Sequence, residues 1–324
     1  MNIIRRPRRN RQSAAIRDMV QENHLSVNDL IFPLFVVDGQ RIKSEVSSMP
    51  GIYRYSPDLL LDEIQQCVDL GLRAFDLFPN IAEAKKDRLA TESYNPDGLY
   101  LSTIRAIKDR FPDIALMTDV AMDPYSSDGH DGIVANRKIL NDETLEVLGR
   151  MALAQAQAGA DIVGPSDMMD GRVGYIRQTL DAGGFTNVAI MSYAAKYASA
   201  FYGPFRDALD SAPKFGDKKT YQMNPANSRE ALIEAELDLA EGADFLMVKP
   251  ALPYLDIIKL LSDNFDLPIA AYNVSGEYAM VKAAALNGWL DGERAMLEAL
   301  LSIKRAGAKV ILTYFAKEVA QLVR

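Results

Sequence analysis

The sequence predicts one α/β domain, an eight-fold βα barrel of the TIM type, preceded by an extended N-terminal arm. Three observations predict this fold. Eight short runs of aliphatic, β-branched or aromatic residues recur along the chain, amphipathic helical segments separate them, and glycines close several of these helices just before the next run. Continuous apolar strands that alternate with amphipathic helices form a parallel sheet covered on its outer face. Eight such units close into a barrel.

The predicted strands are short and apolar. In chain order they span Leu30–Val37, Ala74–Phe78, Ala115–Ala121, Asp161–Pro165, Val188–Tyr193, Phe245–Val248, Pro268–Val274 and Val310–Phe315. Capping residues mark where several helices begin, namely the Ser56-Pro57 pair, Asn141, Asn227 or Ser228, Ser275 and Asp291. Four glycines stand where a left-handed C-cap ends a helix before a strand, namely Gly71, Gly159, Gly242 and Gly307.

An open doubly wound sheet is the main alternative to a barrel for this alternation. Such a sheet usually carries a glycine-rich phosphate loop directly after its first strand. Here the first strand runs into Val37, Asp38 and Gly39, and no loop of that kind follows. We therefore expect a closed catalytic barrel over residues 28–324, because barrels of this type often reach about 250 residues as one domain.

Residues 1–27 form the predicted arm, which is basic although the whole chain is acidic. The net charge of the chain is −8, whereas residues 1–20 carry six arginines against Asp18 alone. An arginine-rich start is also compatible with a transit peptide or a nucleic-acid arm. Asp18 and Glu22 do not suit a transit peptide, and no aromatic residues interleave with the arginines as a single-strand binder requires. We expect packing on an acidic neighbouring subunit and no nucleic-acid partner.

Composition also bears on the expected location. No segment approaches the run of about 18 consecutive apolar residues that reads as a membrane-spanning helix, so no membrane partner is expected. The single cysteine, Cys67, excludes an intrachain disulfide, and its apolar-periodic surroundings are typical of a buried thiol. A reducing, cytoplasmic setting is therefore expected.

Reactive side chains follow the predicted strands at the end of the barrel where enzymes of this fold place their active sites. Lys196 and Lys249 follow strands five and six, which should lie about 4.8 Å apart. A single lysine there is equally well explained by packing on the rim with its ammonium in water. Two ammonium groups in one poorly solvated site lower each other's pKa, and a neutral amine can attack a carbonyl. The pair therefore predicts imine chemistry.

The segment after the third predicted strand is rich in aspartates. Asp119, Asp123, Asp128 and Asp131 all fall within residues 119–132. Carboxylate oxygens suit a hard cation such as Mg²⁺, although the spacing is not that of an EF-hand. From the spacing alone, a solvated and turn-rich loop is the better interpretation.

Several motifs in the right order resemble one enzyme family. They are Asp119–Gly132, Gly164–Arg172, Met191–Tyr197, Phe201–Arg206, Met247–Pro250 and Tyr272–Tyr278. With them, the chain is similar over essentially its whole length to the porphobilinogen synthase (5-aminolevulinate dehydratase) family. The resemblance implies a lyase that condenses two 5-aminolevulinate molecules to porphobilinogen with loss of two waters, in tetrapyrrole biosynthesis. It also implies a homo-octamer whose N-terminal arms wrap neighbouring subunits.

The resemblance assigns the two lysines to two substrates. Lys249 forms a Schiff base with the first substrate, and Ser275 and Tyr314 hold the carboxylate of that molecule. Lys196 binds the second substrate. Asp119 orients the amine of the second substrate or relays protons.

The resemblance also places a carboxylate clamp around the second substrate. Its members are Arg206, Lys218 and Gln222. The last two lie on the polar, glycine-containing segment 207–225, which is expected to close over the site as a lid.

The family resemblance bears on metals as well. Zinc-dependent members have three cysteines where Ala121, Asp123 and Asp131 stand here, so no thiolate Zn²⁺ site is expected. The chain is similar to the aspartate-rich class, which relies on Mg²⁺ or a monovalent cation. Asp123 and Asp131 become candidate ligands of an active-site cation. From its position on a predicted helix alone, Glu234 would be an ordinary exposed charge. The resemblance makes it the candidate ligand of an allosteric Mg²⁺.

Two other functions fit the same fold. An imine-forming aldolase needs only one catalytic lysine, and a silent barrel that serves as a binding or assembly module needs none. The joint presence of Lys196, Lys249, Ser275 and Tyr314 favours the condensing enzyme. Formation of a pyrrole from 5-aminolevulinate separates it from both alternatives.

Overall fold

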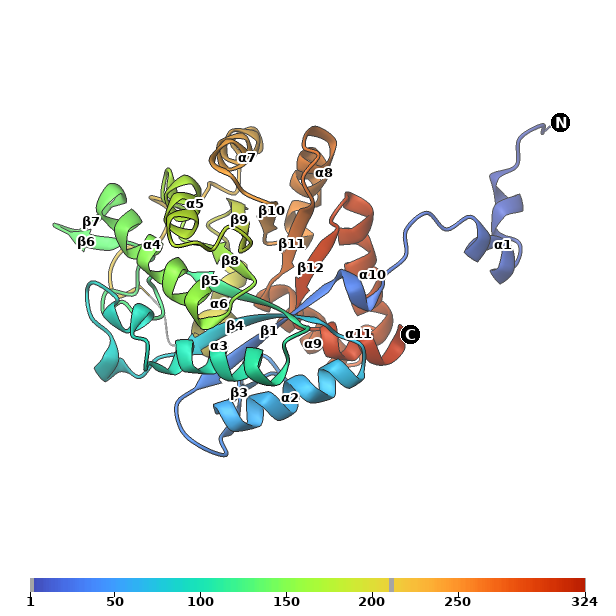
Figure 1. Cartoon of the computed structure of the whole chain (residues 1–324). Helices are drawn as coiled ribbons and strands as arrows, with labels where there is room; N and C mark the ends of the chain where they lie inside the picture. The colour runs from blue at the N-terminus through green and yellow to red at the C-terminus, as the bar shows by residue number, and fades with distance from the viewer. Residues whose placement is uncertain (1–2, 210–212, 324) are drawn as a thin grey trace.

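The computed structural model describes residues 3–209 and 213–323, in which eight parallel strands close a barrel (Figure 1). Each barrel strand pairs with the next one in chain order, and the last pairs with the first. The predicted fold is therefore confirmed, and every predicted strand is a barrel strand. The barrel comprises β1 (Leu30–Val37), β4 (Ala74–Asn80), β5 (Ala115–Val120), β8 (Ile162–Pro165), β9 (Ala189–Lys196), β10 (Phe245–Lys249), β11 (Ile269–Asn273) and β12 (Val310–Thr313).

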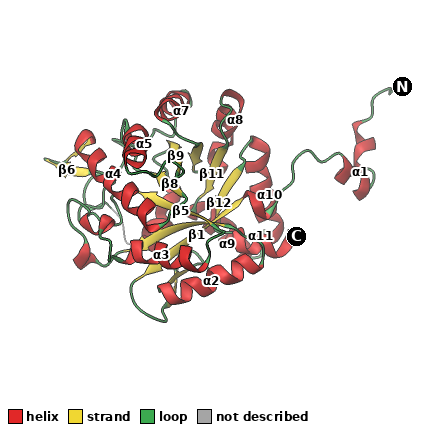
Figure 2. Ribbon diagram, in the orientation of Figure 1, coloured by secondary structure: helices red, strands yellow, loops and turns green. Residues whose placement is uncertain are grey.

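Helices surround the barrel as an outer layer (Figure 2). Gly159, Gly242 and Gly307 end three of them at φ angles of 110°, 104° and 120°, which glycine adopts without the strain a Cβ would cause. The first outer helix begins at Pro57, directly after Ser56 as predicted, although the Ser56 side chain makes no capping hydrogen bond to the helix. The outer helices are α2 (Pro57–Asp69), α3 (Leu99–Arg110), α4 (Asn141–Ala158), α5 (Arg172–Ala182), α7 (Glu230–Glu241), α8 (Leu255–Asn264), α10 (Gly292–Ala306) and α11 (Ala316–Leu322).

Short elements that the sequence analysis missed extend the loops between the barrel strands and helices. They are too short for hydrophobic periodicity to reveal them. These elements are β2 (Lys43–Glu45), β3 (Tyr53–Tyr55), the hairpin β6 (Ile133–Ala135) and β7 (Lys138–Leu140), and α6 (Gly203–Leu209). The helix predicted to begin at Ser275 is present as α9 (Ser275–Leu286), between β11 and α10. Single 3-10 turns span Pro7–Arg11, Val27–Asp29, Glu83–Lys85, Thr91–Tyr94, Ala200–Tyr202 and Leu252–Tyr254.

The N-terminal arm projects away from the barrel (Figure 1). Its helix α1 (Ala14–Met19) and the 3-10 turn before it contain no buried residue. Two residues of the predicted arm (1 and 2) and three of the predicted lid (210–212) lie outside the described residues. Among the helices that the structure describes, none has the length and apolar character needed to cross a bilayer.

Candidate active site

Lys196 and Lys249 lie side by side in the mouth of the barrel. They are the last residues of β9 and β10, they are register partners, and each is only 6% exposed. Lys196 donates a hydrogen bond to the carbonyl oxygen of Ser166. The Nζ atom of Lys249 lies among aromatic rings, at 4.4 Å from the ring centroid of Tyr272, 4.9 Å from that of Tyr193, 5.1 Å from that of Phe205 and 5.5 Å from that of Tyr202.

An extra residue in β9 turns Lys196 towards the barrel interior. Residues three apart on a regular strand face opposite sides of the sheet. Here Tyr193 and Lys196 share the inner face, with Nζ of Lys196 5.8 Å from the Tyr193 ring centroid. A bulge explains this, because β9 uses three residues where β10 uses two, with Ser192 opposite Leu246 and Ala195 opposite Val248.

The mouth contains groups that titrate close to neutral pH. Burial and the neighbouring ammonium of Lys196 lower the pKa of Lys249 to about 7. Burial raises the pKa of Asp119 on β5 to about 6, although both lysines act in the opposite direction. A neutral amine and a carboxyl group that both titrate near pH 7 suit nucleophilic attack and proton transfer.

The inner wall beneath the lysines includes an aspartate that the sequence analysis missed. Asp76 of β4 is completely buried, and burial together with the carboxylate of Asp119 raises its pKa well above the usual range. Gly164 of β8 leaves space for its neighbours, because a Cβ at that position would lie 2.4 Å from Cε of Met117 and 3.2 Å from Cε2 of Tyr193. A signal was available, since Asp76 interrupts an otherwise apolar strand.

Lys218 bridges the two aspartates that the sequence analysis considered as cation ligands. Its Nζ atom lies 3.0 Å from Oδ2 of Asp123 and 3.0 Å from Oδ2 of Asp131, and all three residues are buried. Burial acts to raise the pKa of Asp131, but Lys218 outweighs it and holds this pKa at about 2. In the described residues, no cluster of three or more Asp, Glu, His or Cys side chains could hold a metal. An ammonium group therefore lies where a cation was expected.

Residues 213–225, the described part of the predicted lid after α6, dock on the aspartate-rich loop. The ring nitrogens of His130 lie 3.0 Å from the carbonyl oxygen of Phe215 and 3.0 Å from the hydroxyl of Tyr221. Near the end of this segment, the backbone N–H of Met223 donates to the carbonyl oxygen of Lys196 at 3.0 Å. The segment is thus fixed to both the aspartate-rich loop and the strand that ends in Lys196.

Ser275 and Tyr314 lie on elements that adjoin Lys249. Ser275 begins α9 immediately after β11, and its Oγ accepts a hydrogen bond from the backbone N–H of Phe205 at 3.0 Å. Tyr314 follows β12, and its hydroxyl lies 3.0 Å from that of Tyr272, whose ring faces Lys249. Each predicted carboxylate ligand therefore contacts a residue whose ring lies next to the amine of Lys249. For Ser275 this residue is Phe205, and for Tyr314 it is Tyr272.

Arg206 and Gln222 complete the predicted substrate-binding set. Arg206 is partly buried on α6, and Gln222 is buried in the segment that follows. The carbonyl oxygen of Ala208 near the end of α6 accepts hydrogen bonds from Arg54 at 2.6 Å and from Asn80 at 3.0 Å. These contacts satisfy a helix-terminal carbonyl and fix the helix that carries Arg206.

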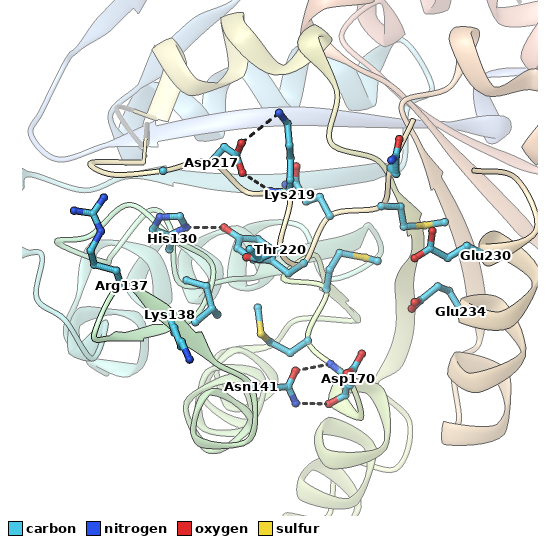
Figure 3. A pocket seen from close by; sticks show the side chains of 18 of the residues that line it. His130, Arg137, Lys138, Asn141, Asp170, Asp217, Lys219, Thr220, Glu230 and Glu234 are labelled. Atoms are coloured by element: carbon cyan, nitrogen blue, oxygen red, sulfur yellow. Dashed lines mark hydrogen bonds and ion pairs between the residues drawn. The ribbon is translucent and has the colours of Figure 1, made fainter. Parts of the chain in front are cut away.

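Glu234 lies on α7, at the wall of a cavity of about 850 Å³ (Figure 3). Glu230 and Asp170 lie on the same side of this cavity, with Arg137 and Lys138 on the other side. Glu234 is partly buried, and burial raises its pKa. It is therefore not the ordinary exposed charge that its helical position indicated. Neither Lys196 nor Lys249 lines this cavity, so Glu234 lies outside the site formed by the two lysines.

Comparison with known proteins decides the family, because the model of the delta-aminolevulinic acid dehydratase family matches residues 4–322. The chain belongs to this family. The chloroplastic delta-aminolevulinic acid dehydratase of Physcomitrium patens is 60% identical over 318 residues, which cover 98% of this chain and 73% of the relative. The delta-aminolevulinic acid dehydratase of Bradyrhizobium diazoefficiens is 53% identical over 325 residues, which cover 100% of this chain and 92% of the relative.

A solved structure shows the same relationship in three dimensions. It is the crystal structure of delta-aminolevulinic acid dehydratase (porphobilinogen synthase) from Toxoplasma gondii ME49 in complex with the reaction product porphobilinogen. It matches this chain with a TM-score of 0.97 at 53% sequence identity, over 99% of this chain and 92% of the other. The predicted family and enzyme class, a lyase of the delta-aminolevulinic acid dehydratase family, are confirmed.

The expected cytoplasmic location is wrong. Relatives from Physcomitrium patens, Oryza sativa and Arabidopsis thaliana are named as chloroplastic, which points to a plastid. The expectation rested on a single buried cysteine. A lone thiol indicates a reducing environment but does not distinguish the cytosol from other reducing compartments.

Proposed function

We propose that this delta-aminolevulinic acid dehydratase condenses two 5-aminolevulinate molecules to one porphobilinogen, with loss of two waters, through Schiff bases on Lys249 and Lys196. The observation that carries the proposal is the register pairing of these two buried lysines at the ends of β9 and β10. A single imine-forming lysine would explain an aldolase. Two amines in one mouth suit a reaction that joins two ketone substrates.

Lys249 is the proposed nucleophile toward the first substrate. With its pKa lowered to about 7 by burial and by Lys196, a large fraction of its side chain is the neutral amine at physiological pH. The amine nitrogen attacks the ketone carbon and the C–N bond forms. The former ketone oxygen then takes one proton from the amine nitrogen and one from an acid in the mouth, for which Asp119 is the candidate, and leaves as water. The product is a positively charged imine surrounded by the rings of Tyr193 and Tyr272, whose faces attract cations.

The other residues of the mouth have supporting roles in this proposal. Asp119, with a pKa of about 6, can accept or donate a proton beside Lys196. Ser275 and Tyr314 hold the carboxylate of the substrate on Lys249. Arg206 and Gln222 hold that of the second substrate, and Lys218 joins them when a substrate carboxylate replaces one of its two aspartate partners.

Substrate trapping combined with a pyrrole assay tests the function. Wild-type protein, Lys249→Ala, Lys196→Ala and the surface control Lys259→Ala are mixed with 5-aminolevulinate. Borohydride reduction, peptide mass spectrometry and a colour reagent for the pyrrole follow. We expect a reduced adduct on Lys249 in all but Lys249→Ala, and at least about a thousandfold loss of pyrrole formation in both active-site variants. Pyrrole formation that survives in Lys249→Ala, or an adduct found only on other residues, would contradict the proposal.

We further propose that the chain belongs to the Mg²⁺-dependent, aspartate-rich class, in which Mg²⁺ or a monovalent cation supports activity. The positions of the zinc cysteines hold Ala121, Asp123 and Asp131, so thiolate ligands are missing from that loop. The Asp123–Asp131 pair does not fit an additional cation while Lys218 lies between the two carboxylates. We therefore assign no catalytic step to a metal there.

Glu234 fits an allosteric Mg²⁺ better. Mg²⁺ commonly binds one or two carboxylates and keeps several waters, so Glu234 would supply a single carboxylate and waters in the roomy cavity beside it would supply the other ligands. We expect Mg²⁺ to stimulate the wild-type chain and Glu236→Gln, which alters an exposed residue of the same helix, but not Glu234→Gln. Equal stimulation of Glu234→Gln and wild type would remove Glu234 from the proposal.

We propose a homo-octamer in which the N-terminal arms pack on neighbouring subunits. The support is the exposure of apolar residues on an arm that contacts little of its own barrel. Ile4 is 83% exposed and Met19 is 78% exposed. Removal of residues 1–20 is expected to reduce the number of subunits per assembly measured by analytical ultracentrifugation. An unchanged number of subunits would contradict this role.

A further inference from the structure

Asp76 lies deep inside the barrel, below the level of the two lysines. Its register partners are Pro33 on β1 and Met117 on β5. Phe78, two residues further along the same face of β4, reaches the mouth, where its ring packs edge-on against Phe205 at 5.1 Å. Asp76 is completely buried, and within the described residues neither of its carboxylate oxygens has a hydrogen-bond partner.

A carboxyl group in this position is costly for the fold. A buried polar group without a hydrogen bond destabilises a protein unless another interaction compensates. Inward-facing positions of such barrels are ordinarily filled by apolar side chains. The presence of Asp76 there points to an electrostatic role for the charge that it can carry.

Several titratable groups face Asp76 from the surrounding elements. The charged ones are Asp119 on β5 and Lys249 on β10, and of the two lysines only Lys249 acts on the pKa of Asp76. The remaining groups are tyrosines on α3, β9, β11 and after β12, namely Tyr100, Tyr193, Tyr272 and Tyr314.

Lys249 lacks a close counter-ion. In the described part of the chain it forms no salt bridge, and its amine is surrounded by rings. Asp119 raises the pKa of Lys249 more than Asp76 does, but Asp119 is shared, because Lys196 acts on its pKa more strongly than Lys249 does. Asp76 is therefore the carboxyl group that interacts with Lys249 without also interacting with Lys196.

We propose that Asp76 is a positioning residue that acts as the internal counter-ion of Lys249, stabilising from inside the barrel the positive charge of its ammonium and of its Schiff base. The Schiff-base part of this inference rests on the proposed function. While Lys249 is a neutral amine, burial favours the protonated, neutral form of Asp76. When Lys249 becomes a positively charged imine, the ionised form of Asp76 is favoured and balances the new charge.

Two substitutions remove the charge in different ways. Asp76→Asn keeps the shape and polarity of the side chain, whereas Asp76→Val replaces it with an apolar, β-branched residue that suits a strand. Asp69→Asn, at the exposed end of α2, is the matched control. If the amide variant fails to fold, the valine variant alone decides, since it removes the unpartnered carboxyl group and should raise the thermal unfolding midpoint.

The decisive measurement needs no substrate. The pKa of Lys249 is obtained from the pH dependence of its acetylation by acetic anhydride, followed by peptide mass spectrometry of the full-length protein. A carboxylate raises the pKa of a nearby amine, so both Asp76 variants should lower the pKa of Lys249 by about one unit relative to wild type and Asp69→Asn. An unchanged or raised pKa of Lys249 in both variants would overturn the inference.

The reaction provides a second, separate readout. Both Asp76 variants should lower kcat about tenfold, because the charged imine loses its counter-ion, while KM changes less. A wild-type protein that forms no adduct on Lys249 refutes the proposed function, but the acetylation result still tests the link between Asp76 and Lys249. A changed unfolding midpoint with an unshifted pKa of Lys249 would show that Asp76 has a structural role only.

Discussion

Lys196 and Lys249 are register partners at the last positions of two hydrogen-bonded parallel strands, and their ammonium groups share the ring of Tyr193. The two charges are therefore not independent. The proton that Lys249 must lose before it attacks a ketone is made more acidic by burial and by the charge on Lys196. A change at either lysine should alter the chemistry of the other.

Removal of the Lys196 charge should make Lys249 a poorer nucleophile at neutral pH. In Lys196→Met the pKa of Lys249 should rise above its present value of about 7, so the ammonium form persists to higher pH. Borohydride trapping over a range of pH measures Schiff-base formation on Lys249. The pH at which adduct formation falls off on the acidic side should rise by at least about one unit. Lys259→Met, on the exposed face of α8, should leave this pH unchanged. An unchanged or lower value in Lys196→Met would show that the two amines are not coupled.

Lys218→Met should release residues 213–225 from the aspartate-rich loop. The substitution leaves the buried carboxylates of Asp123 and Asp131 facing each other without their common ammonium. Loss of one partner from a buried ion pair costs on the order of 3 kcal/mol, most of which should appear as local opening of residues 213–225. Limited proteolysis within this segment should accelerate roughly a hundredfold and KM should rise. The neighbouring Lys219→Met, whose side chain is 75% exposed, is the control, and equal cleavage rates in the two variants would contradict the prediction.

Gly276→Ala should disturb the contact between α9 and the segment before α6. A Cβ at Gly276 would lie 2.5 Å from the carbonyl oxygen and 2.7 Å from the Cα of Phe201, and backbone atoms cannot yield as a flexible side chain does. We expect a destabilisation of about 1–3 kcal/mol in chemical denaturation, together with a higher KM, because Ser275 moves with the helix. Gly203→Ala, where a Cβ has open space, should be close to neutral. Equal stability of the two variants would mean that this contact is not close in solution.

Arg172→Met should be among the most destabilising single changes outside the barrel mouth. The guanidinium is buried between the carboxylates of Asp167 and Asp238, with Nη2 3.3 Å from Oδ2 of Asp238. Its removal leaves two buried acids without their partner, for which a cost of about 3–5 kcal/mol is typical. Arg150→Met, which breaks an exposed pair with Glu146, should cost less than about 1 kcal/mol. Urea denaturation of both variants measures the difference, and similar midpoints would refute the assigned importance of the buried pair.

The strands and the lysine pair were predictable because they depend on local patterns. Apolar runs such as Phe245–Val248 leave little alternative to a strand, and the order of strands in a barrel follows the order of the chain. From that order alone, Lys196 and Lys249 had to end neighbouring strands. The family resemblance then predicted Ser275, Tyr314 and Arg206 as further members of the site, and these roles stay predictions.

Contacts between segments far apart in the sequence were not predictable in the same way. The ion pairs of Lys218 join residues 87 and 95 positions apart, and no local pattern indicates which of two oppositely charged segments will meet. The apolar run Ala74–Phe78 predicts a strand but not the role of Asp76 within it. The alternation of side chains along β4 places Asp76 on the same face as Phe78. The role of Glu234 came from the family resemblance, since helical position alone does not reveal how deeply a charge is buried.

The bulge in β9 means that the second amine depends on a count of residues as much as on the identity of residue 196. Deletion of one residue between Ser192 and Ala195 would restore regular pairing with β10 and rotate the lysine outward, where it would meet the surrounding helices and no longer its partner. Conversely, in a barrel with one amine at a strand end, a single inserted residue can turn an outward-facing lysine at the end of the neighbouring strand into the barrel. A designer who wishes to convert a one-imine barrel into a two-imine barrel should therefore alter the length of a strand before altering its composition.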